Sequence, residues 1–83
     1  MKVLYFAWLR TKTGCAQEDL SPPAHVGDVA ALVKWLKQRS PGHAEALADL
    51  SAVRAAVNQE FVAFDHALAS DDEVALFPPV TGG

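Results

Sequence analysis

The 83-residue sequence has few of the features that mark nucleic-acid-binding, secreted or membrane proteins. Its single cysteine, Cys15, allows no disulfide within the chain. Its seven lysines and arginines form no long run and its formal net charge is −3, which argues against a nucleic-acid surface. The longest apolar stretch, residues 3–9, is far below the ~20 residues that cross a bilayer, and no export signal precedes it. We therefore expect a reduced, cytoplasmic location, with no nucleic-acid or membrane partner.

Groups that could carry catalysis or bind metal are also sparse. Cys15 lies in a predicted loop, without a neighbouring base that would make it a thiolate. His25, His43 and His66 show no spacing typical of zinc ligands, and no cysteine pair accompanies them. The acidic residues 71–73 lack the spacing of a calcium loop and are typical of a solvated turn. The sequence thus predicts no metal site, no bound cofactor and no catalytic centre of its own.

The chain does have ample apolar residues, at 51% of its composition, which is enough for one packed core. One helix is clearly indicated, because Val29, Leu32, Val33 and Leu36 fall on a single face. Asp28, directly before this stripe, is a suitable N-cap.

Short runs rich in β-branched and aromatic residues predict strands, with turns between them. The expected strands cover 3–9, 16–20, 53–57, 60–64 and 73–77; turns cover 10–14, 58–59 and 70–72, and a short second helix covers 43–50. This order predicts an α+β fold, a mixed sheet with one main helix packed across one face. If the first and last strands lie side by side in parallel, the fold is a ubiquitin-like β-grasp. Its domain would cover residues 1–77, followed by an extended, flexible C-terminal tail over 78–83.

Alternation along the strands predicts an apolar patch on the sheet face away from the main helix. The patch would contain Phe6, Trp8, Phe61 and Phe77, and contiguous exposed apolar area of this kind usually marks a protein interface. The alternative is that loops or the second helix cover these side chains. We expect Phe6, Phe61 and Phe77 to contribute to docking.

The sequence ends in Gly82-Gly83 after the two prolines Pro78 and Pro79. Prolines favour an extended backbone, and glycine has no Cβ, so such a tail can enter a narrow pocket of another protein. The reactive group would be the α-carboxylate of Gly83. Once it is adenylated, a sulfur nucleophile would yield a thiocarboxylate, whereas an amine would yield an amide, as in ubiquitin-type conjugation. The tail alone does not decide between the two.

Three segments carry a resemblance that extends over nearly the whole chain. They are Lys-Val-Leu-Tyr-Phe-Ala-Trp-Leu-Arg at 2–10, Ala-Val-Asn-Gln at 56–59 and Asp-Glu-Val-Ala-Leu-Phe-Pro-Pro-Val-Thr-Gly-Gly at 72–83. These segments resemble the MoaD family, the small sulfur-carrying subunits of molybdopterin synthase. The Phe-Pro-Pro-Val-Thr-Gly-Gly ending is the specific element, since thiamine-pathway carriers share the diglycine but usually not the Phe-Pro-Pro.

The resemblance implies a sequence of events centred on Gly83. A MoeB-type enzyme would use Mg-ATP to adenylate Gly83, and a persulfide would convert it to the thiocarboxylate. Gly82 would be a thin spacer, and the segment that guides the tail into a large, MoaE-type subunit would comprise Phe77, Pro78, Pro79, Val80 and Thr81. The sulfur would pass to cyclic pyranopterin monophosphate in a complex of two small and two large subunits. The alternatives are a sulfur carrier for a thiamine or amino-acid pathway, a protein modifier, and a β-grasp interaction module with an inert tail.

Overall fold

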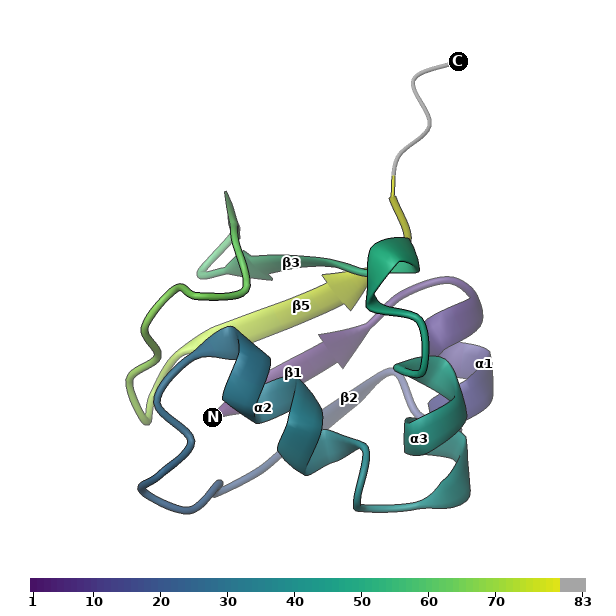
Figure 1. Ribbon diagram of the computed structural model, residues 1–83, viewed down its shortest axis with the longest axis horizontal. Helices are drawn as coiled ribbons and strands as arrows, with labels where there is room; N and C mark the ends of the chain where they lie inside the picture. Colours follow the sequence, from purple (N-terminus) through teal and green to yellow (C-terminus); the bar gives the residue numbers. More distant parts are fainter. Residues whose placement is uncertain (80–83) are drawn as a thin grey trace.

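A mixed five-stranded sheet forms the centre of the protein, for which a computed structural model describes residues 1–79 (Figure 1). The strands are β1 (Lys2–Tyr5), β2 (Gln17–Asp19), β3 (Arg54–Val57), β4 (Glu60–Val62) and β5 (Glu73–Phe77), in the order β2-β1-β5-β3-β4. β1 and β5 are parallel and central, and the other neighbouring pairs are antiparallel. The parallel pairing of the first and last strands, on which the predicted fold depended, is therefore confirmed.

The main helix, α2 (Val29–Leu36), crosses one face of the sheet (Figure 1). Its predicted stripe is buried, and the Asp28 side chain accepts a hydrogen bond of 2.8 Å from the backbone N–H of Ala31. A carboxylate at this position satisfies a helical N–H that has no partner within the helix. The N-cap and the buried face were both predicted correctly.

The core lies between α2 and the sheet. Val3 and Tyr5 of β1 and Val74 and Leu76 of β5 point towards it and are almost fully buried, together with the apolar stripe of α2. Leu4 and Ala75, on the alternate positions, are only half-buried. Alternation therefore gave the correct face for these residues of β1 and β5, and within residues 1–79 no helix covers the other face of the sheet.

The predicted first strand is wrong beyond Tyr5. The chain turns at Ala7 and enters a helix, α1 (Trp8–Thr13), which ends at Gly14 with φ 84°. Leu9 on this helix is fully buried. A short apolar run is compatible with either a strand or a buried helix. Here residues 8–13 form a helix that packs Leu9 into the core.

Other element boundaries also differ from the predictions. The predicted second helix begins earlier, as α3 (Pro41–Ala46), and is followed by a short 3₁₀ helix, η1 (Leu50–Ala52). The strands expected over 16–20 and 60–64 are three residues each, as β2 and β4. Within residues 1–79, no helix has the length and apolar character needed to cross a membrane.

Candidate functional site

An exposed group of three phenylalanines lies on the sheet face opposite α2, and we call Phe6, Phe61 and Phe77 the aromatic patch. Phe61 is 82% exposed and Phe6 is 49% exposed, while Phe77 is half-buried. The rings of Phe61 and Phe77 are tilted against each other with centroids 5.5 Å apart. The predicted apolar patch is therefore confirmed at these three positions.

The patch surrounds a shallow hollow whose floor is made by small residues. Ala56 of β3 stands opposite both Phe61 of β4 and Ala75 of β5, so two methyl groups lie where larger side chains would fill the space. The backbone N–H of Phe6 donates to the carbonyl of Leu76 at 3.1 Å, which fixes Phe6 beside β5. The hollow is lined by Phe6, Ala56, Gln59, Phe61, Ala75, Phe77 and Pro78. Large residues at the rim and alanines at the centre give an apolar surface that another protein could fill.

Trp8 was predicted to belong to the same patch, but it does not line this hollow. It is 36% exposed and begins α1 instead of continuing β1. The prediction placed it by strand alternation, which no longer applies after the turn at Ala7.

The last strand ends at the edge of the aromatic patch. β5 ends at Phe77, and Pro78, which follows it, lines the hollow. Pro79 is half-buried. The predictions for Val80, Thr81, Gly82 and Gly83 lie outside the described residues. The structure therefore brings together the aromatic patch and Pro78, the start of the predicted tail.

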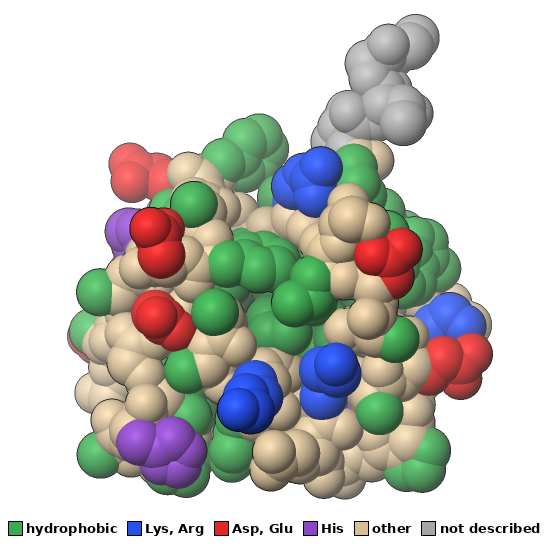
Figure 2. Space-filling model, in the orientation of Figure 1, with side chains coloured by type: hydrophobic (Ala, Val, Ile, Leu, Met, Phe, Trp, Pro, Cys, Tyr) green, Lys and Arg blue, Asp and Glu red, His purple; other side chains and the backbone are tan. Residues whose placement is uncertain are grey.

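A second apolar hollow lies on the α2 side of the molecule. Figure 2 shows apolar side chains at its centre and basic side chains along one edge. It is lined by Ala30, Val33, Lys34, Lys37, Gln38 and Leu50. This hollow was not predicted, because its lining comes from α2 and from η1, which are separate segments of the sequence.

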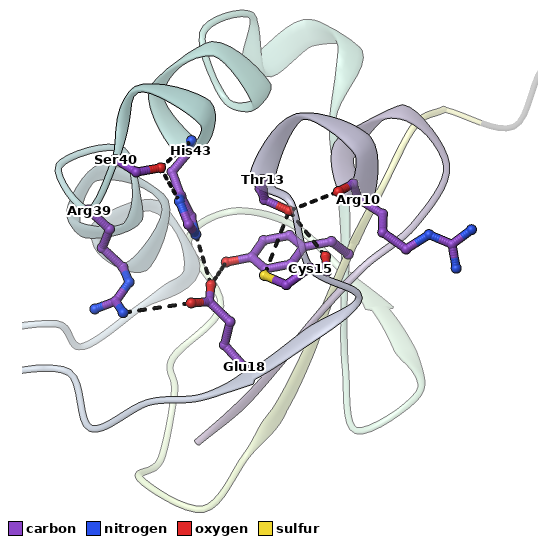
Figure 3. A network of polar contacts seen from close by, with 8 residues as sticks. Arg10, Thr13, Cys15, Glu18, Arg39, Ser40 and His43 are labelled. Atoms are coloured by element: carbon purple, nitrogen blue, oxygen red, sulfur yellow. Dashed lines mark hydrogen bonds and ion pairs between the residues drawn. The ribbon is translucent and has the colours of Figure 1, made fainter.

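A buried polar network was also missed by the sequence analysis. Glu18 of β2 accepts hydrogen bonds at its Oε2 atom from the Tyr5 hydroxyl, at 2.7 Å, and from His43 Nε2, at 2.8 Å (Figure 3). A carboxylate only accepts, so Nε2 carries the proton in this arrangement. Ser40 Oγ lies 2.7 Å from His43 Nδ1, and Arg39 lies 3.6 Å from Glu18 Oε1.

This network changes the acidity of its members. Burial alone would raise the pKa of Glu18, but the hydrogen bonds from His43 and Tyr5, helped by the charge of Arg39, hold the pKa below its usual value. Burial, followed by the nearby carboxylate of Glu18, raises the pKa of Tyr5 well above its usual range. Burial also raises the pKa of Cys15. At neutral pH, Glu18 is therefore an ionised carboxylate beside two neutral groups, the Tyr5 hydroxyl and the Cys15 thiol.

The fold defines a class of protein. A parallel central strand pair, antiparallel flanking strands and a helix across one face make this a ubiquitin-like β-grasp domain. The profile of the ThiS family matches residues 3–83, and the chain belongs to this family.

Several relatives match nearly the whole chain. The molybdopterin synthase sulfur carrier subunit of Escherichia coli K12 is 45% identical over 83 residues, 100% of this chain and 99% of that protein. Among solved structures, a putative molybdopterin converting factor subunit 1 from Pyrococcus furiosus superposes with a TM-score of 0.78 at 32% identity, covering 95% of both chains. SAMP1 from Haloferax volcanii superposes with a TM-score of 0.74 at 29% identity, covering 100% of this chain and 98% of the other.

Proposed function

We propose that this protein is the sulfur-carrier subunit of a molybdopterin synthase and acts in molybdenum cofactor biosynthesis. The observation that carries the proposal is the 45% identity, across the full chain, to the E. coli protein of that name. The aromatic patch supports it independently, because a carrier must dock on the partner that uses its sulfur.

The chemistry is assigned to Gly83, the last residue of the sequence. Its carboxylate attacks ATP in a MoeB-type partner, which forms an acyl-adenylate and releases pyrophosphate. A persulfide sulfur then displaces AMP, and reductive cleavage of the resulting acyl disulfide by a second thiol leaves the thiocarboxylate. Mg-ATP belongs to the activating enzyme, and this chain itself binds no cofactor for the reaction.

Delivery of the sulfur requires a second partner. The aromatic patch docks on a large, MoaE-type subunit, and the segment from Phe77 to Thr81 guides Gly82 and Gly83 towards the pterin precursor, cyclic pyranopterin monophosphate. The large subunit supplies the general acid–base groups. Because a dithiolene contains two sulfurs, we propose an assembly of two small and two large subunits in the cytoplasm.

The direct test is the intact mass of the chain after incubation with a MoeB-type enzyme, Mg-ATP and a persulfide donor. We expect the mass to increase by the difference between one sulfur and one oxygen, and fragmentation to place this change at Gly83. The matched control is a variant that lacks Gly83, which should remain folded and unchanged in mass.

A second stage of the same experiment separates the alternative functions. Adding a MoaE-type subunit and the pterin precursor to the thiocarboxylate form should return Gly83 to a carboxylate and yield molybdopterin. Isopeptide-linked adducts instead would indicate a protein modifier. No mass change, with the activating enzyme active on a control carrier, would contradict the proposal.

A further inference from the structure

Three side chains with metal-ligating atoms meet at the edge of the sheet formed by β2, the opposite edge from β4 of the aromatic patch. Cys15 lies in the loop after α1, Glu18 on β2 and His43 on α3. The Cys15 sulfur, a Glu18 oxygen and a His43 ring nitrogen all lie within 4.8 Å of one another (Figure 3). We propose that these three residues form a binding site for one zinc-type divalent cation, a site separate from the sulfur-carrier chemistry.

The spacing suits a tetrahedral ion after a small adjustment. With metal–ligand bonds of about 2.0–2.3 Å, the ligand atoms around zinc lie about 3.5 Å apart. In the structure the His43 nitrogen and the Glu18 oxygen are 2.8 Å apart, held by a hydrogen bond, and the cysteine sulfur is within 4.8 Å of both. An ion that enters between them needs the first pair to separate by less than an ångström. The sulfur, within 4.8 Å of both, has to approach by no more than about 1.3 Å to reach that spacing, which a loop residue can do.

The surroundings are those of a shielded site with one open side. His43 is 6% exposed, the Glu18 side chain is 17% exposed, and Cys15 is partly buried. Three protein ligands leave a fourth position for water on the exposed side. Because neighbouring protein excludes most of the solvent, the attraction between the ion and its ligands is weakly screened.

Supporting groups already hold the ligands in place. When Nε2 gives up its proton to bind the ion, Nδ1 takes up a proton, and Ser40 Oγ, at 2.7 Å, can accept a hydrogen bond from Nδ1–H. Arg39, at 3.6 Å, stays with the free oxygen of Glu18, and Thr13 contacts the Cys15 sulfur. Coordination thus replaces two hydrogen bonds, that of His43 with Glu18 and the one that the Cys15 thiol donates to Thr13, and leaves the contacts of Ser40 and Arg39 in place.

The donor set and its charge select the class of ion. A thiolate, a carboxylate and a neutral imidazole carry two negative charges, which a divalent cation neutralises; the cysteine proton leaves to solvent. A sulfur and a nitrogen donor favour zinc over magnesium or calcium, which prefer oxygen ligands alone. The sequence predicted no metal site because the three residues show no local spacing, and only the fold of β2 against α3 brings them together.

The test is equilibrium dialysis of the full-length chain, in a thiol-free buffer, against Zn²⁺ alone, followed by metal analysis. We expect one tightly bound zinc per chain and a higher melting temperature in its presence. Cobalt, as a spectroscopic probe, should show thiolate-to-metal charge transfer. Cys15 should also become resistant to alkylation when zinc is bound.

Cys15→Ser is the decisive variant, because Cys15 is only partly buried and the domain should fold without the thiol. We expect it to weaken zinc binding by about 100-fold or more and to abolish the cobalt charge-transfer band, since even supporting groups contribute about 10- to 100-fold. His43→Gln should weaken binding similarly. The matched control is His25→Gln, which changes an exposed histidine outside the cluster and should bind zinc as before. Unchanged zinc binding in Cys15→Ser, or no binding by the unaltered chain, would overturn the proposal.

Discussion

Gly42, in the first turn of α3, touches the backbone of α1. A Cβ at this position would overlap the carbonyl oxygen of Lys12, a backbone atom that cannot rotate away. We expect Gly42→Ala to lower the free energy of unfolding by about 1 kcal/mol or more, because overpacking typically costs about 1–3 kcal/mol and exceeds the helix-propensity gain of about 1 kcal/mol. Urea denaturation at constant pH measures the difference.

Gly27→Ala is the matched control for this substitution. A Cβ there meets no atom within 4 Å, and the φ of Gly27 is not in the positive region. Alanine should therefore leave the free energy of unfolding unchanged or raise it by about 0.4–1 kcal/mol, because it lowers the conformational entropy of the unfolded chain. Equal effects of the two substitutions would show that α1 and α3 do not approach through Gly42.

Asp72 should make the free energy of unfolding of the domain fall at acid pH. Its carboxylate accepts hydrogen bonds from the backbone N–H of Ala69, at 2.8 Å, and from the Asn58 side chain, at 3.0 Å, and these lower the pKa of Asp72. A carboxylate whose pKa is lowered by folding stabilises the folded state above its unfolded pKa. This contribution is lost as the pH falls through the lowered folded pKa.

Urea midpoints measured from neutral pH down to acid pH test this dependence. Asp72→Asn should be less stable than the unaltered chain at neutral pH and should lose less stability on acidification. The exposed neighbour Asp71 provides a control, since Asp71→Asn should retain the acid dependence. Parallel curves for Asp72→Asn and the unaltered chain would contradict the role of the Asp72 carboxylate.

At the level of helices and strands, the turn between β1 and α1 is the main departure from the sequence prediction. Ala7, before α1, has φ 55° and ψ −132°, a backbone conformation that glycine adopts far more easily than alanine. We expect Ala7→Gly to raise the free energy of unfolding by about 1 kcal/mol, because such strain costs about 1–3 kcal/mol and the added freedom of glycine in the unfolded chain offsets part of it.

Thermal and urea unfolding of Ala7→Gly should be compared with those of Ala30→Gly. Ala30 is exposed in the first turn of α2, where glycine is a poorer helix former than alanine by up to about 1 kcal/mol. The two substitutions change the same side chain and should have opposite signs. A loss of stability in both would mean that the turn at Ala7 is not strained.

The sequence predicted those features that depend on neighbouring residues, and it missed those that depend on contacts between distant segments. The stripe of α2 and the alternation along β1 and β5 are set by neighbouring residues, and they predicted the main helix and the aromatic patch. The parallel pairing of β1 with β5 joins the two ends of the domain, and the sequence offered it only as a condition of the predicted fold. α1 was missed because residues 3–9 are apolar throughout, and only burial of Leu9 distinguishes helix from strand there. The contacts among Cys15, Glu18 and His43 join residues up to 28 positions apart, so no local spacing could reveal them.

In the domain as a whole, the two faces of the sheet have different roles. α2 covers one face and completes the core (Figure 1). The other face carries the aromatic patch, next to Pro78 at the end of β5. The Cys15–Glu18–His43 cluster lies at the β2 edge, away from β4. Binding of a partner at the patch and of an ion at the cluster can therefore be altered separately by substitution.

Phe61→Ala tests the role of the uncovered face. Phe61 is 82% exposed, so its removal should leave the free energy of unfolding nearly unchanged. Binding to a MoaE-type subunit, measured by calorimetry, should weaken by about tenfold or more, because large aromatic anchors contribute over about 1 kcal/mol each at interfaces. Phe77→Ala, which removes the ring that Phe61 packs against, should weaken binding similarly while the domain stays folded.

Leu50→Ala separates a specific docking surface from general surface hydrophobicity. Leu50 is 37% exposed and lines the hollow beside α2, on the other side of the sheet from the aromatic patch. Its substitution should leave the affinity for the large subunit unchanged. If Leu50→Ala weakened binding as much as Phe61→Ala, binding would follow general surface hydrophobicity and the aromatic patch would not be a specific docking site. If Phe77→Ala unfolded the domain, Phe77 would belong to the core, and Phe6 and Phe61 alone would form the exposed contact.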